Sequence, residues 1–242
     1  MPSNLQPAYI WSRECVFSGK PQRNVLLVEW KGAVQQAAGG KKSQRIAARS
    51  IELRIWPEPH VSLTGLQGCR SVTRGERALV LSLGDIRAGQ SKYLAFEFML
   101  DSREPGHHET LWLQWRYSRR QGERCRELPV QKLTLEYSRH TGYLNAAASF
   151  YVEKQLELLR TDEMIAKASD LYVSGRRGEA KELLRRHGDK LLLLGIRSGD
   201  NELAREAQSL YMQSDREMFL EREENKKQDC RVKDERPVGK YS

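Results

Sequence analysis

Arginine side chains are dense in one short segment of the chain. Five of them fall within eleven residues, and aromatic side chains stand beside them in the sequence. These basic residues are Arg116, Arg119, Arg120, Arg124 and Arg126. A guanidinium group binds phosphate or carboxylate through paired hydrogen bonds. Ordinary solubilising charge is the first interpretation of the segment, a contact with a protein or anionic partner is the second, and nucleic-acid binding is the third.

Aromatic residues in the same segment could add stacking contacts. Trp112, Trp115 and Tyr117 precede the basic cluster in LWLQWRYSRR. Side chains alternate between the two faces of a strand, so Trp115 and Tyr117 are expected in the core. Trp112 falls on the opposite face, where an exposed ring could stack on a partner. The predicted partner-binding residues are Arg116, Arg119, Arg120, Arg124, Arg126 and Trp112.

A second group with chemical potential is His107-His108-Glu109, which follows Pro105-Gly106. A metal ion would need further ligands from elsewhere in the chain to complete its coordination. A solvated loop between strands is the preferred interpretation. We therefore expect no metal site.

Local motifs of known catalytic sites do not occur in the sequence. There is no G-x-S-x-G, H-E-x-x-H or G-x-G-x-x-G pattern, and GGKKS at Gly39 to Ser43 lacks the earlier glycine of a phosphate-binding loop. We expect neither catalytic residues nor a cofactor. The sequence is thus interpreted as that of a non-enzymatic protein, with an enzyme of unrecognised type, whose residues converge only in three dimensions, as the third hypothesis.

Composition describes a folded, basic protein. The 242 residues are 39% hydrophobic and 30% charged, and 41 Lys and Arg against 32 Asp and Glu leave a net charge of +9. This excess favours acidic partners. The four cysteines are scattered and predict reduced thiols. The N-terminus carries no secretory pattern and the apolar runs VLLV and LLLLGI are too short to span a bilayer, so a cytoplasmic location is expected.

The strand-rich part is predicted at residues 45–138. In IELRIW, Ile51, Leu53 and Ile55 alternate with polar residues, and KYLAFEFML repeats this pattern. Short strands at this spacing, without intervening helices, are typical of an antiparallel β-sandwich. Residues 1–44 are expected to be poorly ordered, with one strand at Val25 to Trp30.

The clearest expected element is a β-hairpin in LWLQWRYSRRQGERCRELPVQKLTLEY. Its second strand changes phase, because Leu133, Leu135 and Tyr137 do not align with Leu128 and Val130. A bulge or an edge position near Pro129 would account for the change.

Helical periodicity follows in residues 143–222, where four helices with short links predict an antiparallel bundle. Asn145, Asp162 and Asp200 are candidate N-caps, and Gly175 a helix end, while Gly188 is expected to interrupt or kink the third helix. The polar tail at 225–242 is expected to be disordered. The predicted fold class is α+β, a β-sandwich followed by an α-helical hairpin bundle.

Three stretches, IELRIWPEPHVSLTGLQG, LSLGDIRAGQSKYLAFEFML and ASDLYVSGRRGEAKELL, resemble the accessory region that follows the A domain in bacterial von Willebrand factor A (vWA) proteins. Together they cover roughly residues 45 to 215. The D-x-S-x-S metal motif of the A domain itself has no counterpart here, so no metal site is carried over. The resemblance implies a truncated relative or a stand-alone accessory region, and with it a role as an interaction and positioning module.

Overall fold

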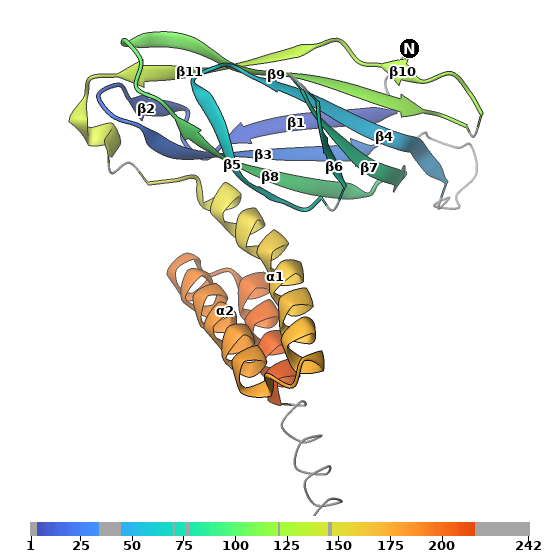
Figure 1. The fold of residues 1–242 in the computed structure, drawn as a ribbon, viewed down its shortest axis with the longest axis vertical. Helices are drawn as coiled ribbons and strands as arrows, with labels where there is room; N and C mark the ends of the chain where they lie inside the picture. Colours follow the sequence, from blue (N-terminus) through green and yellow to red (C-terminus); the bar gives the residue numbers. More distant parts are fainter. Residues whose placement is uncertain are drawn as a thin grey trace, which may run out of the picture. The chain divides into compact units, whose positions relative to one another are not determined.

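The computed structural model describes residues 4–33, 45–69, 71–75, 78–120, 122–144 and 147–215. The chain divides into two compact units, Met1–Leu159 and Arg160–Ser242. The first contains the strands and the start of a long helix, and the second is helical. The fold is therefore α+β, as the sequence predicts (Figure 1).

The first unit is a sandwich of two sheets (Figure 1). The four-stranded sheet has the order β1 (Leu5–Trp11), β3 (Gln22–Gly32), β8 (Ser91–Leu100) and β5 (Val61–Gln67). The seven-stranded sheet has the order β2 (Cys15–Phe17), β11 (Gln131–Ser138), β9 (Gly106–Ser118), β4 (Ile46–Pro57), β7 (Leu79–Arg87) and β6 (Val72–Arg74), with β10 (Arg126–Glu127) also paired to β9. The pairings within both sheets are antiparallel except that of β2 with β11, which is parallel.

The core lies between the two sheets and contains the side chains that alternation assigns to it. The predicted inward residues of β4, β8 and β9 are all buried: Ile51, Leu53, Ile55, Leu94, Phe96, Phe98, Leu100, Leu111, Leu113, Trp115 and Tyr117. Trp30 of the four-stranded sheet and Trp115 of the seven-stranded sheet lie with their ring centroids 5.7 Å apart. The Trp115 Nε1–H donates a hydrogen bond to the Tyr9 hydroxyl at 2.7 Å, which joins the two sheets across the core.

The expectation of a poorly ordered segment before residue 45 is wrong for Leu5–Gly32, which forms β1, β2 and β3. The sandwich therefore begins 40 residues earlier than its predicted start. The chain enters the four-stranded sheet with β1, crosses to the other sheet for β2, and returns for β3. The remaining part of that expectation, residues 34–44, lies outside the described residues.

Strand β3 is buried on both faces, which explains its continuous apolar sequence. Leu26 and Val28 face the main core, while Leu27 packs with Ala95 of β8 against Val152 and Leu156. These last two residues belong to the first turns of helix α1 (Phe150–Val173). The start of α1 therefore covers the outer face of the four-stranded sheet.

The predicted hairpin is present, with β9 and β11 paired antiparallel. The second strand is interrupted where the pattern changes phase, since β10 ends at Glu127 and β11 begins at Gln131. Pro129 lies in this gap, as predicted, and a further register shift occurs between Leu133 and Thr134. Leu135 and Tyr137 are buried after that shift.

The second unit consists of the rest of α1, helix α2 (Arg177–Ser198) and a helix at residues 201–215. The first two predicted helices are one, because α1 continues through Asp162, and α2 is likewise not broken at Gly188. Gly175, with φ +80°, ends α1 as predicted. Asp200 Oδ1 accepts hydrogen bonds from the backbone N–H groups of Glu202 and Leu203, which confirms the predicted cap.

The buried residues of this unit come from all three helices and include Ala168, Ala180, Leu184, Leu191, Leu194, Leu203, Ala207 and Leu210. The predicted disordered tail at 225–242 lies outside the described residues. None of the described helices is long and apolar enough to cross a membrane.

Candidate partner-binding face

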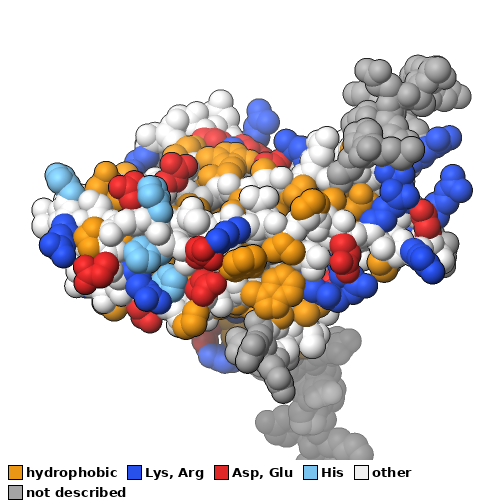
Figure 2. Space-filling view, turned by 90° about the horizontal axis from the view of Figure 1, so that it is seen from above, with side chains coloured by type: hydrophobic (Ala, Val, Ile, Leu, Met, Phe, Trp, Pro, Cys, Tyr) orange, Lys and Arg blue, Asp and Glu red, His pale blue; other side chains and the backbone are white. Residues whose placement is uncertain are grey.

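Residues that alternation turns away from the core form the outer face of the seven-stranded sheet. Trp56 of β4 and Trp112 of β9 are directly opposed in the strand register, and both lie on this outer face. Figure 2, seen from the side on which Figure 1 draws this sheet uppermost, shows apolar side chains among charged ones of both signs. Two features of this face could bind a partner.

The first feature is an apolar depression of about 450 Å³, which we call the tryptophan groove. It is lined by Trp56, Pro57, Glu58, Trp112, Gln114 and Val130. Trp112 is 38% exposed and Val130 is 48% exposed. Val130 lies in the gap between β10 and β11, so the interruption of the strand supplies one side of the groove.

The Trp112 ring is held in place by two polar contacts. Its Nε1–H donates a hydrogen bond to Glu58 Oε1 at 3.1 Å. The Lys132 Nζ lies 5.1 Å from the ring centroid, in cation–π contact, and also pairs with Glu109. The exposed ring is therefore positioned before any partner binds, which lowers the entropy lost on binding.

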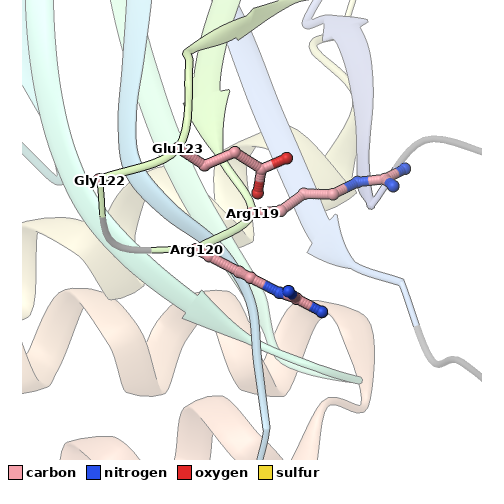
Figure 3. A pocket seen from close by; sticks show the side chains of 4 residues that line it. All are labelled: Arg119, Arg120, Gly122 and Glu123. Carbon is pink, nitrogen blue, oxygen red and sulfur yellow. The ribbon is translucent and has the colours of Figure 1, made fainter.

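The second feature is the segment after β9 made of Arg119, Arg120 and residues 122–125, which we call the arginine loop. Arg119, Arg120, Gly122 and Glu123 line a cavity of about 430 Å³. Figure 3 shows the guanidinium groups of Arg119 and Arg120 extending to one side of the loop. Gly122 has φ +77°, a left-handed conformation that glycine adopts without strain and that lets the loop turn.

The predicted arginines differ in what they already bind. Arg116 Nε lies 2.9 Å from Glu127 Oε1 and its Nη1 lies 3.5 Å from Glu52 Oε1. Arg126 pairs with Glu123 at 3.3 Å. Arg119, Arg120 and Arg124 form no ion pair with any residue of the described ranges. The uncompensated charge of the cluster is thus concentrated in the loop.

One nitrogen of the loop is also unusual. The Arg119 Nε is buried and has no hydrogen-bond acceptor among the described atoms. A buried donor without an acceptor is costly. The binding role predicted for the six residues stays a prediction. The structure places Trp112 in the groove, Arg119 and Arg120 in the loop cavity, and Arg116 in ion pairs on the sheet face.

The histidine cluster does not lie in a loop as expected, because His107, His108 and Glu109 belong to β9. Across the described ranges, no group of three or more His, Cys, Asp or Glu side chains is arranged to hold a metal ion. The described cysteines Cys15, Cys69 and Cys125 form no disulfide. The GGKKS segment lies outside the described residues.

Sequence reasoning missed a buried histidine at this end of the sheet. His60, 7% exposed, lies with its ring centroid 6.5 Å from that of His108 and 6.3 Å from that of Tyr137. Burial lowers the pKa of His60, and the positive charge of Arg103 and the His108 ring lower it further. The lowered pKa favours the neutral form of this buried ring.

Sequence reasoning also missed the other five residues of the groove, Trp56, Pro57, Glu58, Gln114 and Val130. For Trp56 a signal existed, because it is out of phase with Ile51, Leu53 and Ile55 and so belongs on the outer face. Pro57 and Val130 carried no such signal, since their approach to Trp112 depends on the pairing of β4 with β9 and on the gap before β11.

Comparison with known proteins gives a likeness of limited extent. No protein-family model matches the sequence, and no curated protein matches it. Among solved structures, a von Willebrand factor type A protein from Catenulispora acidiphila matches with a TM-score of 0.47 and 14% identity over 65% of this chain and 38% of its own. The N-terminal domain of the Streptococcus gordonii adhesin Sgo0707 matches with a TM-score of 0.36 and 5% identity over 55% of this chain and 32% of its own.

The VWA2 paralog of ArnB from Sulfolobus acidocaldarius matches with a TM-score of 0.48 and 8% identity, over 87% of this chain and 98% of its own. The chain thus spans less than two fifths of the length of the first two of these structures and nearly all of the third. At these TM-scores and identities the similarity is too limited to transfer a function.

Proposed function

We propose that this chain is a non-enzymatic, cytoplasmic protein-interaction module, related to the accessory region of bacterial vWA proteins, and that it binds an acidic protein partner with the outer face of β4 and β9. The observation that carries the proposal is the tryptophan groove, where Trp112 and Val130 are exposed next to Trp56 on the seven-stranded sheet. The sequence stretches that resemble the accessory region support the same class of role.

The residue types on this face support binding. Tryptophan and arginine dominate the binding energy of protein interfaces, because a large ring excludes water and a guanidinium group forms several directed hydrogen bonds. The groove volume of about 450 Å³ is in the range of sites that hold a few side chains or a small ligand. The net charge of +9 and the free arginines of the loop favour an acidic partner.

A comparative pull-down tests this proposal. The intact chain is used as bait in native lysate of its source, next to Trp112→Ser and to Val173→Ser. Val173 is an 84% exposed apolar residue of α1, so its replacement controls for general loss of surface hydrophobicity. We expect a partner that the wild-type chain and Val173→Ser retain and Trp112→Ser loses. Equal retention by all three would contradict the proposed binding face.

Nucleic-acid binding is the second candidate, and the unpaired Arg119, Arg120 and Arg124 favour it. Contacts with phosphate make the affinity fall steeply with the logarithm of salt concentration. If this candidate holds, replacement of the three arginines by Ser reduces the slope of that dependence by about three on a duplex or a single strand. An unchanged slope removes the loop from consideration.

A further inference from the structure

The tryptophan groove and the arginine loop are at two ends of a line along one strand. Trp112 and Gln114 of β9 line the groove, and Arg119 and Arg120 follow the end of the same strand. A strand rises about 3.3 Å per residue, so the seven residues from Trp112 to Arg119 separate the two features by on the order of 20 Å. A partner segment of similar, extended conformation needs about six or seven residues to reach from one to the other.

The surface between the two ends is electrically compensated. Arg116 pairs with Glu52 and Glu127, and Arg54 pairs with the same Glu52 at 2.7 Å. Exposed pairs of this kind contribute little to stability, but they leave neither a free cation nor a free anion for a partner to match. A complementary ligand is therefore apolar at one end, uncharged in the middle and acidic at the other end.

Carboxylates along this path argue against a polyphosphate ligand. Glu58 lines the groove, Glu109 pairs with Lys132 beside Trp112, and Glu127 lies next to Arg116. A nucleic-acid backbone carries a negative charge at every nucleotide and would find no unpaired cation along this path to match those charges. A peptide can keep its negative charge at the loop alone.

We infer that this face binds an extended acidic segment of a protein, which places an apolar side chain such as leucine or proline in the tryptophan groove and two or more carboxylates at the arginine loop, six or seven residues away. The inference rests on the proposed function and names its ligand class. Apolar rings such as Trp56 and Trp112 suit a proline or leucine anchor, and the Arg119 and Arg120 forks suit carboxylate oxygens.

Selection of peptides on the full-length chain tests the inference. A random dodecapeptide display library is panned at physiological salt against the wild-type chain and against Trp112→Ser. We expect the wild-type chain to enrich sequences with an apolar residue and an acidic pair at the stated separation. Enrichment of neutral or basic sequences, or of the same sequences by both chains, would overturn the inference.

The affinity of one enriched peptide for variants of the groove and of the arginine loop then shows whether the peptide contacts both features. Trp112→Ser and Val130→Glu, which places a carboxylate in the groove, should each weaken binding by about thirtyfold or more. Replacement of Arg119, Arg120 and Arg124 by Ser should weaken binding about tenfold and reduce its salt dependence. The matched control replaces three other exposed basic residues, Lys20, Arg23 and Arg139, and should change the affinity less than about twofold.

The control variant also shows whether the peptide is attracted by the arginine loop or by the net charge of the whole chain. If both triple variants weaken binding equally, net charge and not the loop attracts the peptide, and the inference fails. If a single-stranded oligonucleotide displaces the peptide at lower concentration than the free peptide itself, the ligand is nucleic acid and the inference also fails. Failure of the selection leaves the pull-down unaffected, so loss of the ligand class and loss of the proposed function give different results.

Discussion

Two core tyrosines, the partly buried Tyr9 and the buried Tyr137, make a paired test of how the sandwich is stabilised. Burial raises the pKa of Tyr9 to about 12, and burial likewise raises the pKa of Tyr137 to about 12. The two hydroxyl groups differ in their partners. The Tyr9 hydroxyl accepts the hydrogen bond from Trp115 Nε1, whereas the Tyr137 hydroxyl has no hydrogen-bond partner among the described atoms. Replacement of each tyrosine by phenylalanine should therefore have different results.

The magnitudes follow from what each replacement leaves behind. Tyr9→Phe leaves the N–H of Trp115, a 1% exposed residue, without an acceptor in the core. An orphaned buried donor costs about 1–3 kcal/mol of unfolding free energy. Tyr137→Phe removes a buried hydroxyl that lacks a partner, so it should be neutral or stabilise the sandwich by up to about 1 kcal/mol.

Urea denaturation followed by tryptophan fluorescence is the suitable assay. All five tryptophans lie between Trp11 and Trp115, within the first unit, so the signal reports on the sandwich and not on the helical unit. The urea midpoint should fall for Tyr9→Phe and stay or rise for Tyr137→Phe, with the dependence on urea unchanged.

A double-mutant cycle separates the hydrogen bond from other effects of the replacement. In a Trp115→Phe background no donor is left to lose its acceptor, so Tyr9→Phe should cost about 1 kcal/mol less there than in the wild-type chain. Equal effects of Tyr9→Phe and Tyr137→Phe, or equal effects of Tyr9→Phe in both backgrounds, would refute the claim that this bond joins the sheets.

Three further predictions concern other parts of the chain. Because burial lowers the pKa of His60, the unfolded chain binds the proton more readily than the folded chain does. The stability of the sandwich should therefore fall as the pH drops below about 6.5. His60→Gln should make this fall less steep, as measured by the urea midpoint at each pH. Gly32→Ala should destabilise the sandwich by about 1–3 kcal/mol, since a Cβ there would meet the Arg87 carbonyl oxygen at 2.2 Å. Gly199→Ala, at a position with φ +68° and open space around it, should cost about 1 kcal/mol in the helical unit, measured by circular dichroism at the helix band.

The alternation of apolar and polar residues correctly predicted which side chains face the core of the sandwich, because most strands are buried on one side only. It failed at β3, where VLLVEW is apolar without alternation, since α1 covers the outer face and buries Leu27 as well. The sequence predicts the strand, but it could not predict that the strand lies between β1 and β8 in the four-stranded sheet. Asp162 could either cap a new helix or lie within a longer one, and in the structure α1 runs through it without a break. Local capping signals cannot decide between these outcomes, because packing of the whole helix outweighs a single cap.

For the candidate site, composition located the arginine cluster, and alternation assigned Trp112 to the outside. Sequence could not show that Arg116 is paired, because Glu52 reaches it only through the pairing of β4 with β9. The groove could not be predicted from the sequence for a similar reason. Its sides come from β4, from β9 and from the gap that contains Val130, three segments whose proximity only the sheet topology creates.

Because the chain crosses to the seven-stranded sheet for β2 and then returns for β3, the N-terminal strands are synthesised long before some of their partners. Cys15–Phe17 pair with Glu136–Ser138, so this edge of the seven-stranded sheet cannot form until residue 138 has left the ribosome. At about 5–20 residues per second, the N-terminal strands wait on the order of ten seconds for that partner. Strand β3 waits for Ser91–Leu100 of β8 as well. The nascent chain therefore exposes the apolar side chains of β3 before β8 and the start of α1 can cover them, and early chaperone contact is expected at Val25–Trp30.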